Sequence, residues 1–419
     1  MRGIQIAVIW VLYLPIVFGT YIVVWLDRKI HFKLPFPRNV DELSCNPVWL
    51  YEALQKTNAI SNSATYLTCN VIPLKSEMIF RSDACVAQLV YVLNDRQIEE
   101  KYFVKFAPTK GTVWNRTIFN LQLNHIKEID FNQDFVKTDA SIPAPKVHVA
   151  LNSPLTGNLC LVTEYMQNNV EFLDSIYTGF EQQHLLLVLK GLATLHAKFW
   201  EISSVDKLKV MPIEPSTVLL FDNILWWSGV SQRTRKVVEH SWILMNEKET
   251  VLHGDARIGN MMFPKSDKEG RFVFIDWQAV RQGKAVYDLA YFLVLSLEAK
   301  HRKNTEQDAK SIYHSLLCES GVEYPIEKFE IDYNHACLCV LSLISLPFLS
   351  GEASAEGDGA KIFAWGMNVW KERLAEKFGE FDYKWMANAY QLSENECRCS
   401  VQELIALIEK RLSRINTHT

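Results

Sequence analysis

Three polar side chains near the middle of the chain have the types and the spacing that phosphoryl transfer requires. Asp255 and Asn260 lie five residues apart after the apolar pair Val251-Leu252, and Asp276 follows a second apolar run, Phe272 to Ile275. Phosphoryl transfer needs an oriented hydroxyl and neutralised phosphate oxygens rather than covalent chemistry from the protein. One carboxylate for the acceptor proton, with a carboxylate and an amide as oxygen ligands for Mg²⁺, meets that need. The pattern assigns Asp255 as the base and Asn260 and Asp276 as metal ligands.

The flanking residues predict how these side chains are positioned. Both apolar runs are short and rich in strand-forming residues, and the polar segment Pro264 to Gly270 separates them. The two runs are expected to form a buried strand pair, with that polar segment as the turn between them, and each delivers a polar side chain to the rim of the pair. Asp and Asn are also common turn residues at strand ends, and this is the simpler interpretation of any one of the three. Their occurrence together, in this order, favours the catalytic interpretation.

The same part of the chain carries a family resemblance. His-Gly-Asp-x-Arg-x-x-Asn (residues 253–260), Ile-Asp-Trp-Gln (275–278) and Asp-Leu-Ala-Tyr-Phe-Leu (288–293) resemble the choline/aminoglycoside-kinase-like superfamily, specifically its ecdysteroid-kinase-like (CHK kinase-like) branch. Weaker similarity extends over residues 43 to 380. The resemblance implies a two-lobed, protein-kinase-like α+β fold, ATP and Mg²⁺ as cofactors, and a hydroxyl of a small molecule as the phosphate acceptor.

A candidate nucleotide-binding lysine lies on a predicted β-hairpin upstream of the motifs. Val90 to Leu93 and Tyr102 to Phe106 are strand-like runs, and the polar segment Asn94 to Lys101 is expected to form the turn. Alternate residues of the second run share one apolar face, whereas Lys105 lies on the opposite face with Phe103. A surface lysine on a two-sided hairpin is the alternative. The resemblance implies that Lys105 contacts the α- and β-phosphates of ATP.

The other nucleotide-side residues follow from the same comparison. A lysine in this role requires a carboxylate partner, and Glu128 resembles the family residue that supplies it; Asp130, or a helix face that is simply solvated, is the alternative. The strand-like run Leu159 to Met166 ends in a polar connection. Backbone groups around Glu164 to Met166 are candidates for binding adenine, although the same run serves equally as a core strand.

The phosphate loop before the hairpin departs from the expected pattern. No glycine occurs between Gly19 and Gly111, so the loop from Met78 to Ala87 lacks the usual means of close backbone approach to phosphate. Small residues from Ser82 to Ala84 still permit a tight turn with backbone N–H donors. A catalytically silent, membrane-tethered binding module of the same fold is therefore the alternative function.

Two motif residues are expected to be structural. Asp288 stands near the start of a predicted helix and is expected to anchor the catalytic loop. His196 lies on one face of an apolar helix predicted from about Gln182 to Glu201 and is expected to be a packing group, despite its match to the family.

Composition agrees with this assignment. The chain has 419 residues, of which 48% are hydrophobic and 22% charged, so it can bury a sizeable core and is expected to form two lobes. A formal net charge of −4 argues against a nucleic-acid partner. Nine cysteines, with Cys337/Cys339 and Cys397/Cys399 only two apart, fit neither a disulfide ladder nor a zinc site, which predicts reduced thiols.

The amino terminus predicts a transmembrane anchor. Gly3 to Leu26 contains no charged residue, and 24 helical residues span roughly 36 Å, against a hydrocarbon core of about 30 Å. A cleavable signal peptide is the alternative, but the apolar run is long for one. The basic residues that follow, beginning with Arg28 and Lys29, place the remaining chain in the cytosol.

The sequence predicts three domains and an acceptor pocket in the last of them. Residues 1–27 would be the membrane anchor, 28–165 the nucleotide-binding lobe with its juxtamembrane segment, and 166–419 the lobe of the catalytic loop and acceptor pocket. The candidate pocket walls are aromatic: Phe348, Phe363, Trp365 and Trp370. No acidic cluster suited to a polycationic aminoglycoside accompanies them, so the acceptor is expected to be an apolar alcohol, such as a sterol-like or lipid-derived hydroxyl compound. Ordinary core packing is the alternative for any one of these aromatics.

Overall fold

The computed structural model describes residues 2–30, 32–74, 83–108, 113, 116–117, 120, 124–166, 170–171, 182–201, 225, 228–265, 271–297, 299–345 and 358–416. The chain forms two compact units, one comprising Met1–Val170 with Asp276–Ala279 and the other Glu171–Ile275 with Val280–Thr419. The segment Asp276–Ala279 therefore belongs to the first unit, although its sequence neighbours on both sides belong to the second. The N-terminal helix is also part of the first unit rather than a separate segment.

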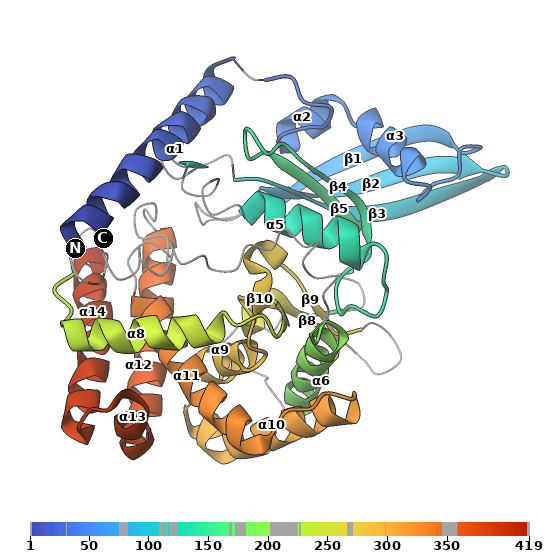
Figure 1. Ribbon diagram of the computed structural model, residues 1–419. Helices are drawn as coiled ribbons and strands as arrows, with labels where there is room; N and C mark the ends of the chain where they lie inside the picture. Colours follow the sequence, from blue (N-terminus) through green and yellow to red (C-terminus); the bar gives the residue numbers. More distant parts are fainter. Residues whose placement is uncertain are drawn as a thin grey trace. The chain divides into compact units, whose positions relative to one another are not determined.

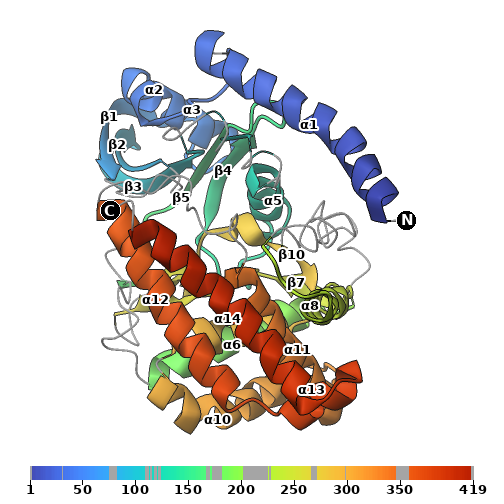
Figure 2. The same ribbon diagram turned by 90° about the vertical axis from the view of Figure 1, so that its left-hand side faces the viewer.

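The first unit is built on a five-stranded antiparallel sheet (Figures 1 and 2). Its spatial order is β1 (Thr65–Leu74), β2 (Ala84–Leu93), β3 (Arg96–Phe106), β5 (Leu159–Glu164) and β4 (Val147–Asn152). The helices of this unit are α1 (Arg2–Ile30), α2 (Val40–Cys45), α3 (Val48–Lys56) and α5 (Asn124–Phe131), and a π-helical turn, η1 (Asn132–Val136), continues α5.

The hairpin between β2 and β3 is tighter than the sequence predicted. Leu93 pairs with Arg96, which leaves only Asn94 and Asp95 in the turn. Both have positive φ, 52° and 57°, as in the two-residue turns whose twist matches that of the strands they join. The prediction of a turn from Asn94 to Lys101 was wrong because polar residues 96–101 continue the ladder as the start of β3.

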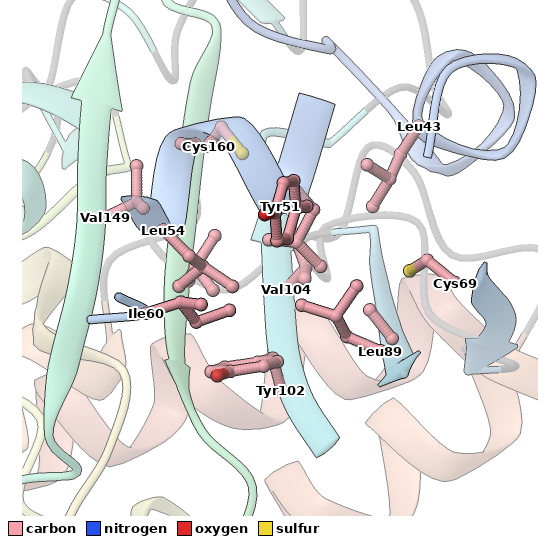
Figure 3. Packing of buried hydrophobic residues seen from close by; sticks show 14 of the residues in the cluster. Leu43, Tyr51, Leu54, Ile60, Cys69, Leu89, Tyr102, Val104, Val149 and Cys160 are labelled. Carbon is pink, nitrogen blue, oxygen red and sulfur yellow. The ribbon is translucent and has the colours of Figure 1, made fainter. Parts of the chain in front are cut away.

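One face of the sheet forms the core of the first unit. Tyr102, Val104 and Phe106 are buried in this core, as their alternation predicted. Tyr51 and Leu54 of α3 pack onto the same cluster (Figure 3). The core thereby fixes the register of β3 and directs Lys105 to the other face of the sheet.

The N-terminal helix ends with contacts inside the first unit. Val24 of α1 is buried, and the Asp27 carboxylate accepts a hydrogen bond of 2.9 Å from the side-chain amide of Asn158. The same carboxylate lies 3.9 Å from the guanidinium of Arg38. Across the part of the chain that is described, no helix has both the length and the apolar character needed to cross a membrane. The predicted transmembrane anchor is therefore not supported.

The second unit is mainly helical. Its helices are α6 (Gln182–Lys198), α8 (Gln232–Met245), α9 (Val286–Ser296), α10 (Ala299–Glu319), α11 (Ile326–Ser345), α12 (Asp358–Gly379), α13 (Tyr383–Tyr390) and α14 (Glu394–Asn416). Figure 2 shows α12 and α14 running side by side. Every residue of α9 is buried, as expected for a helix that is apolar all round.

Short strands frame the motif region of the second unit. β7 (Thr250–Leu252) pairs with β10 (Arg281–Gly283), and β8 (Met261–Pro264) pairs with β9 (Val273–Phe274), both antiparallel. Both apolar runs beside the motifs contain the expected buried strands. The prediction that the two runs pair with each other was wrong, because β7 pairs with β10 and β9 with β8. Antiparallel sheets and helices in these units confirm the predicted α+β class. All nine cysteines lie among the described residues, and none is in a disulfide.

A buried histidine joins three helices of the second unit. His335 of α11 is 3% exposed, and its Nδ1 lies 2.9 Å from the hydroxyl of Tyr390 at the end of α13. Its ring packs edge-on against Trp385 and lies near His240 of α8. Burial, with a contribution from the charge of His240, lowers the pKa of His335 to about 4.

We predict that His335 makes stability depend on pH in mildly acidic solution. In the unfolded chain a histidine takes up a proton near pH 6.5, whereas folded His335 stays neutral down to about pH 4. The folded state should therefore be fully favoured above pH 6.5 and lose about 3 kcal/mol as the pH falls to 4. Urea unfolding of wild type and His335→Phe at several pH values measures this. An identical pH slope in both proteins would contradict the prediction.

Candidate active site

The first unit brings three of the predicted site residues together. Lys105 on β3 is 8% exposed, and its Nζ lies 2.6 Å from Oε1 of Glu128 on α5. The same Nζ lies 2.6 Å from Oδ1 of Asp276. Glu128 is thus in place as the partner expected for the lysine, and the carboxylate predicted as a metal ligand shares that lysine.

The charges of this cluster favour cation binding. Burial by itself lowers the pKa of Lys105, but the charges of Asp276 and Glu128 outweigh it, and the net shift is upward. Lys105 is therefore an ammonium ion at physiological pH. Burial raises the pKa of Glu128 despite the opposing charge of Lys105, so Asp276 is the carboxylate that supplies hard oxygen atoms suited to Mg²⁺. Asp276 is the more accessible of the two carboxylates, because its side chain is 27% exposed and that of Glu128 only 2%.

Asp276 has an unusual backbone conformation. Its φ is +66°, in the left-handed region that a residue with a Cβ occupies at a cost of about 1–3 kcal/mol. The Gln278 amide donates a hydrogen bond of 3.2 Å to its Oδ2. Such a conformation persists only where the surroundings enforce it, so contacts of the Asp276–Ala279 segment maintain the geometry of the cluster.

In the second unit, a buried carboxylate shapes the loop that carries Asp255. Asp288 accepts hydrogen bonds from the backbone N–H groups of His253, at 2.6 Å, and Gly254, at 2.9 Å. Gly254 has φ +82°, a conformation that glycine adopts without penalty. Asp288 therefore anchors the loop, as the sequence predicted.

His196 contacts the Asp288 carboxylate. Its Nε2 lies 3.2 Å from Oδ2 of Asp288, and its Nδ1 lies 2.5 Å from the hydroxyl of Tyr313. These two contacts hold the imidazole between the carboxylate and the tyrosine hydroxyl. Burial raises the pKa of Asp288, but the hydrogen bond and charge of His196, with smaller contributions from His253 and Gly254, lower it on balance. The sequence match at His196 thus marked a support for the loop, not only a packing group.

Asp255 is held by its own loop. The amide nitrogen of Asn260 donates to the backbone oxygen of Asp255 at 2.9 Å and to its Oδ2 at 2.8 Å. Nε of Arg257 donates to Oδ1 at 3.1 Å. Because both amide hydrogens of Asn260 are used in this way, the amide oxygen is the atom that remains for a cation. This amide oxygen is of the type expected for the predicted magnesium ligand.

Tyr291 is a site residue that sequence reasoning missed. Burial raises its pKa well above the ordinary value, and the charge of Asp255, together with a hydrogen bond to it, adds to the shift. Tyr291 lies three residues after Asp288 on α9, so both side chains face the same side of that helix. This spacing was the signal in the sequence that could have identified it.

The residues predicted to bind adenine remain a prediction. The backbone N–H of Glu164 donates to the carbonyl of Lys146 at 2.9 Å, and the Glu164 carboxylate accepts from the N–H of Lys146 at 2.5 Å. Glu164 is therefore engaged in joining β5 to the segment before β4. Met166, just beyond β5, is half-buried.

Several predicted positions lie outside the described residues. The phosphate loop is described only from Asp83, whose carbonyl accepts a hydrogen bond of 2.7 Å from the N–H of Phe106. Phe348 is also outside, as are the side chains of Phe363 and Trp365, although their backbone belongs to α12. Trp370 of α12 is half-buried.

Part of the chain that carries the predicted site residues matches a known family model. Residues 228–322 match the sequence profile of the Ecdysteroid kinase-like family. This segment contains Asp255, Asn260, Asp276 and Asp288. The resemblance to the ecdysteroid-kinase-like branch that the sequence motifs indicated is thereby confirmed over these residues.

More distant similarities extend over larger parts of the chain. An uncharacterized kinase-like protein of Caenorhabditis elegans is 23% identical over 214 residues, which are 46% of this chain and 56% of that protein. The chain thus matches little more than half the length of that relative. Among solved structures, a putative aminoglycoside phosphotransferase of Ralstonia eutropha is 12% identical at a TM-score of 0.44, with 78% of this chain and 97% of that chain covered.

A choline kinase of Cryptosporidium parvum is 10% identical at a TM-score of 0.40, and the match covers 90% of this chain and 98% of that chain. Because these identities and TM-scores are low, only the match over residues 228–322 supports the resemblance to the family.

We predict that Asp288→Asn destabilises the protein by about 2–4 kcal/mol at neutral pH, because the uncharged amide loses the charge-assisted hydrogen bonds from two backbone N–H groups. Since the pKa of Asp288 is lowered in the folded state, its contribution is complete above the unfolded pKa and is lost as the pH falls through the folded value. Urea unfolding at neutral pH and at about pH 3 measures this. A difference between wild type and variant that does not shrink in acid would contradict the prediction.

Proposed function

We propose that this chain is an ATP-dependent phosphotransferase that phosphorylates a hydroxyl group of a small molecule. The observation that carries the proposal is the buried Lys105, held at 2.6 Å by both Glu128 and Asp276. One carboxylate is enough to pair with a structural lysine, and the second, partly exposed one adds oxygen atoms that can bind a metal ion. The family match over the segment of Asp255 and Asn260 supports the same reaction.

The residues present fit Mg²⁺ and ATP. In this proposal Lys105 binds the α- and β-phosphates, and Glu128 keeps its ammonium group oriented. The carboxylate of Asp276 and the amide oxygen of Asn260 are the metal ligands. Backbone groups near Met166 contact the adenine. Bound Mg²⁺ and ATP would supply the γ-phosphoryl group and the positive charge that neutralises its oxygens.

Asp255 is proposed as the base. Its carboxylate accepts the proton of the acceptor hydroxyl as the new bond forms between the hydroxyl oxygen and the γ-phosphorus, while the bond from that phosphorus to the bridging oxygen of ADP breaks. Arg257 and Asn260 donate to this carboxylate and fix its orientation. The proton is held on Asp255 until product leaves.

The acceptor is proposed to be a largely apolar alcohol, such as a sterol-like or lipid-derived hydroxyl compound. The support for this is compositional: α12 and the residues beside it contain several aromatic residues, including Phe363, Trp365 and Trp370. Apolar and aromatic walls are typical of pockets for such ligands. We further propose a cytosolic location, because ATP and Mg²⁺ are available there.

We predict that Asp255→Asn and Asp276→Asn each impair phosphoryl transfer, by different routes. Asp276→Asn removes a charged metal ligand but keeps a residue that tolerates positive φ, so the affinity for Mg·ATP should fall by about tenfold or more. Asp255→Asn should lower turnover by about 10²- to 10⁴-fold with nucleotide affinity nearly unchanged. Calorimetry with Mg·ATP and a transfer assay over a panel of hydroxyl compounds separate the two effects.

Asp308→Asn, the same change on the exposed surface of α10, is the matched control and should leave both quantities at the wild-type level. Nucleotide binding by wild type without transfer to any compound tested would favour the catalytically silent binding module. If wild type binds no nucleotide at millimolar Mg²⁺, the proposed function is wrong.

The acceptor class yields a separate prediction. Replacing Phe363 and Trp365 together by Ala should raise the KM for the acceptor, or abolish turnover, with little change in ATP affinity, because the substituted side chains belong to the proposed acceptor pocket. Steady-state kinetics on a variant that still melts cooperatively checks this. Transfer to cationic amino sugars alone would sink the apolar-alcohol assignment and leave the kinase proposal standing.

A further inference from the structure

An aromatic stack lies beside the Lys105 cluster in the first unit. The ring of Trp277, in the short 3₁₀ turn η4 (Trp277–Ala279), stacks on Phe131 at the end of α5, with centroids 4.5 Å apart and planes 29° apart. Phe131 in turn stacks on Phe135 of the π-helical turn, with centroids 5.8 Å apart. Trp277 is 2% exposed and Phe131 is fully buried.

The stack connects the two segments that carry the carboxylates of the cluster. Trp277 directly follows Asp276, and Phe131 lies three residues after Glu128, within one turn of the same helix. A contact between the two rings therefore fixes the distance between the two carboxylates that share Lys105. Aromatic pairs of this kind contribute beyond the area they bury, because their geometry is specific.

We propose that Trp277 and Phe131 are positioning residues: their stack holds Asp276 and Glu128 in register around Lys105, so that the Asp276 carboxylate is oriented to bind the metal ion before nucleotide arrives. This inference rests on the proposed function and names residues to which neither the motif nor the resemblance gave a role.

The end of α5 next to the stack restrains the position of Glu128. The α-helix passes into a π-helical turn at Asn132, immediately after Phe131. The Asn132 side chain is 3% exposed and donates a hydrogen bond of 2.7 Å to the backbone oxygen of Glu128. π-helical turns are uncommon and occur mostly at functional sites. The bond to the Glu128 carbonyl fixes the turn of helix from which the Glu128 carboxylate reaches Lys105.

The backbone of Asp276 explains why a support is needed. A non-glycine residue at φ +66° relaxes toward ordinary conformations unless its neighbours prevent it. The buried indole that follows it supplies that restraint, and the amide of Gln278 holds Oδ2 at 3.2 Å. Without the ring, Asp276 can leave both Lys105 and the orientation needed for a metal ion.

Ordinary core packing is the competing explanation, and it makes a different prediction. If the stack only fills space, truncating it lowers stability but leaves the dependence of nucleotide binding on Mg²⁺ unchanged. If it positions Asp276, the Mg²⁺ dependence itself shifts, and a substitution that retains an aromatic ring restores it.

The test compares Trp277→Leu with Trp277→Phe in the full chain. Nucleotide affinity is measured by calorimetry across a Mg²⁺ titration, with a melting curve for each protein. Trp277→Leu, which keeps apolar bulk without a ring, should raise the Mg²⁺ concentration for half-maximal nucleotide binding by about tenfold, in the range found when residues that orient metal ligands are replaced. Trp277→Phe should remain within about twofold of wild type.

Phe131→Leu removes the same stack from its other side and should cause the same shift, which keeps the test decisive if Trp277→Leu does not melt cooperatively. Wild-type Mg²⁺ dependence in a folded variant that lacks the stack would overturn this inference and leave the proposed function intact. An equal shift in Trp277→Phe and Trp277→Leu would also overturn it. Absence of nucleotide binding by wild type would instead overturn the proposed function on which the inference rests.

Discussion

The buried ammonium group of Lys105 is the constraint on which the arrangement of the first unit depends. A charge removed from water is costly unless it is paired and hydrogen-bonded, and removing a single partner typically costs several kcal/mol. Lys105 meets this requirement with one carboxylate from α5 and one from the segment at Asp276. The sheet that positions the lysine, the helix that carries Glu128 and the short excursion of the chain at residues 276–279 are therefore needed together.

A second buried charge organises the loop of the second unit in a comparable way. Asp288 is fully buried, and backbone N–H groups of the loop satisfy it from one side while His196 does so from the other. The backbone N–H groups at this sharp bend donate to the Asp288 carboxylate. Its role is therefore structural. The two carboxylates therefore have different roles. Asp288 holds the backbone of the loop through hydrogen bonds. Asp276 pairs with Lys105 and remains partly exposed.

Strain is concentrated where the proposed chemistry requires it. Asp276 has positive φ although it is not glycine, whereas the comparable bend at residue 254 is a glycine and carries no such penalty. A glycine at position 276 would relieve the strain but could not provide a carboxylate. The stack of Trp277 on Phe131 provides a physical reason why the strained conformation persists.

The sequence by itself determined the residues of the catalytic loop, their order, the strands before Asp255 and Asp276, and the face of β3 on which Lys105 lies, because all of these follow from local spacing and two-residue alternation. Only the tertiary structure decided which groups surround them. His196 lies 92 residues from Asp288, and Phe131 lies even farther from Trp277 in sequence. No local pattern encodes such contacts. The apolar run at the amino terminus predicted an anchor that the described part of the chain does not support. Local propensities specify elements, whereas the pairing of buried charges depends on which elements meet.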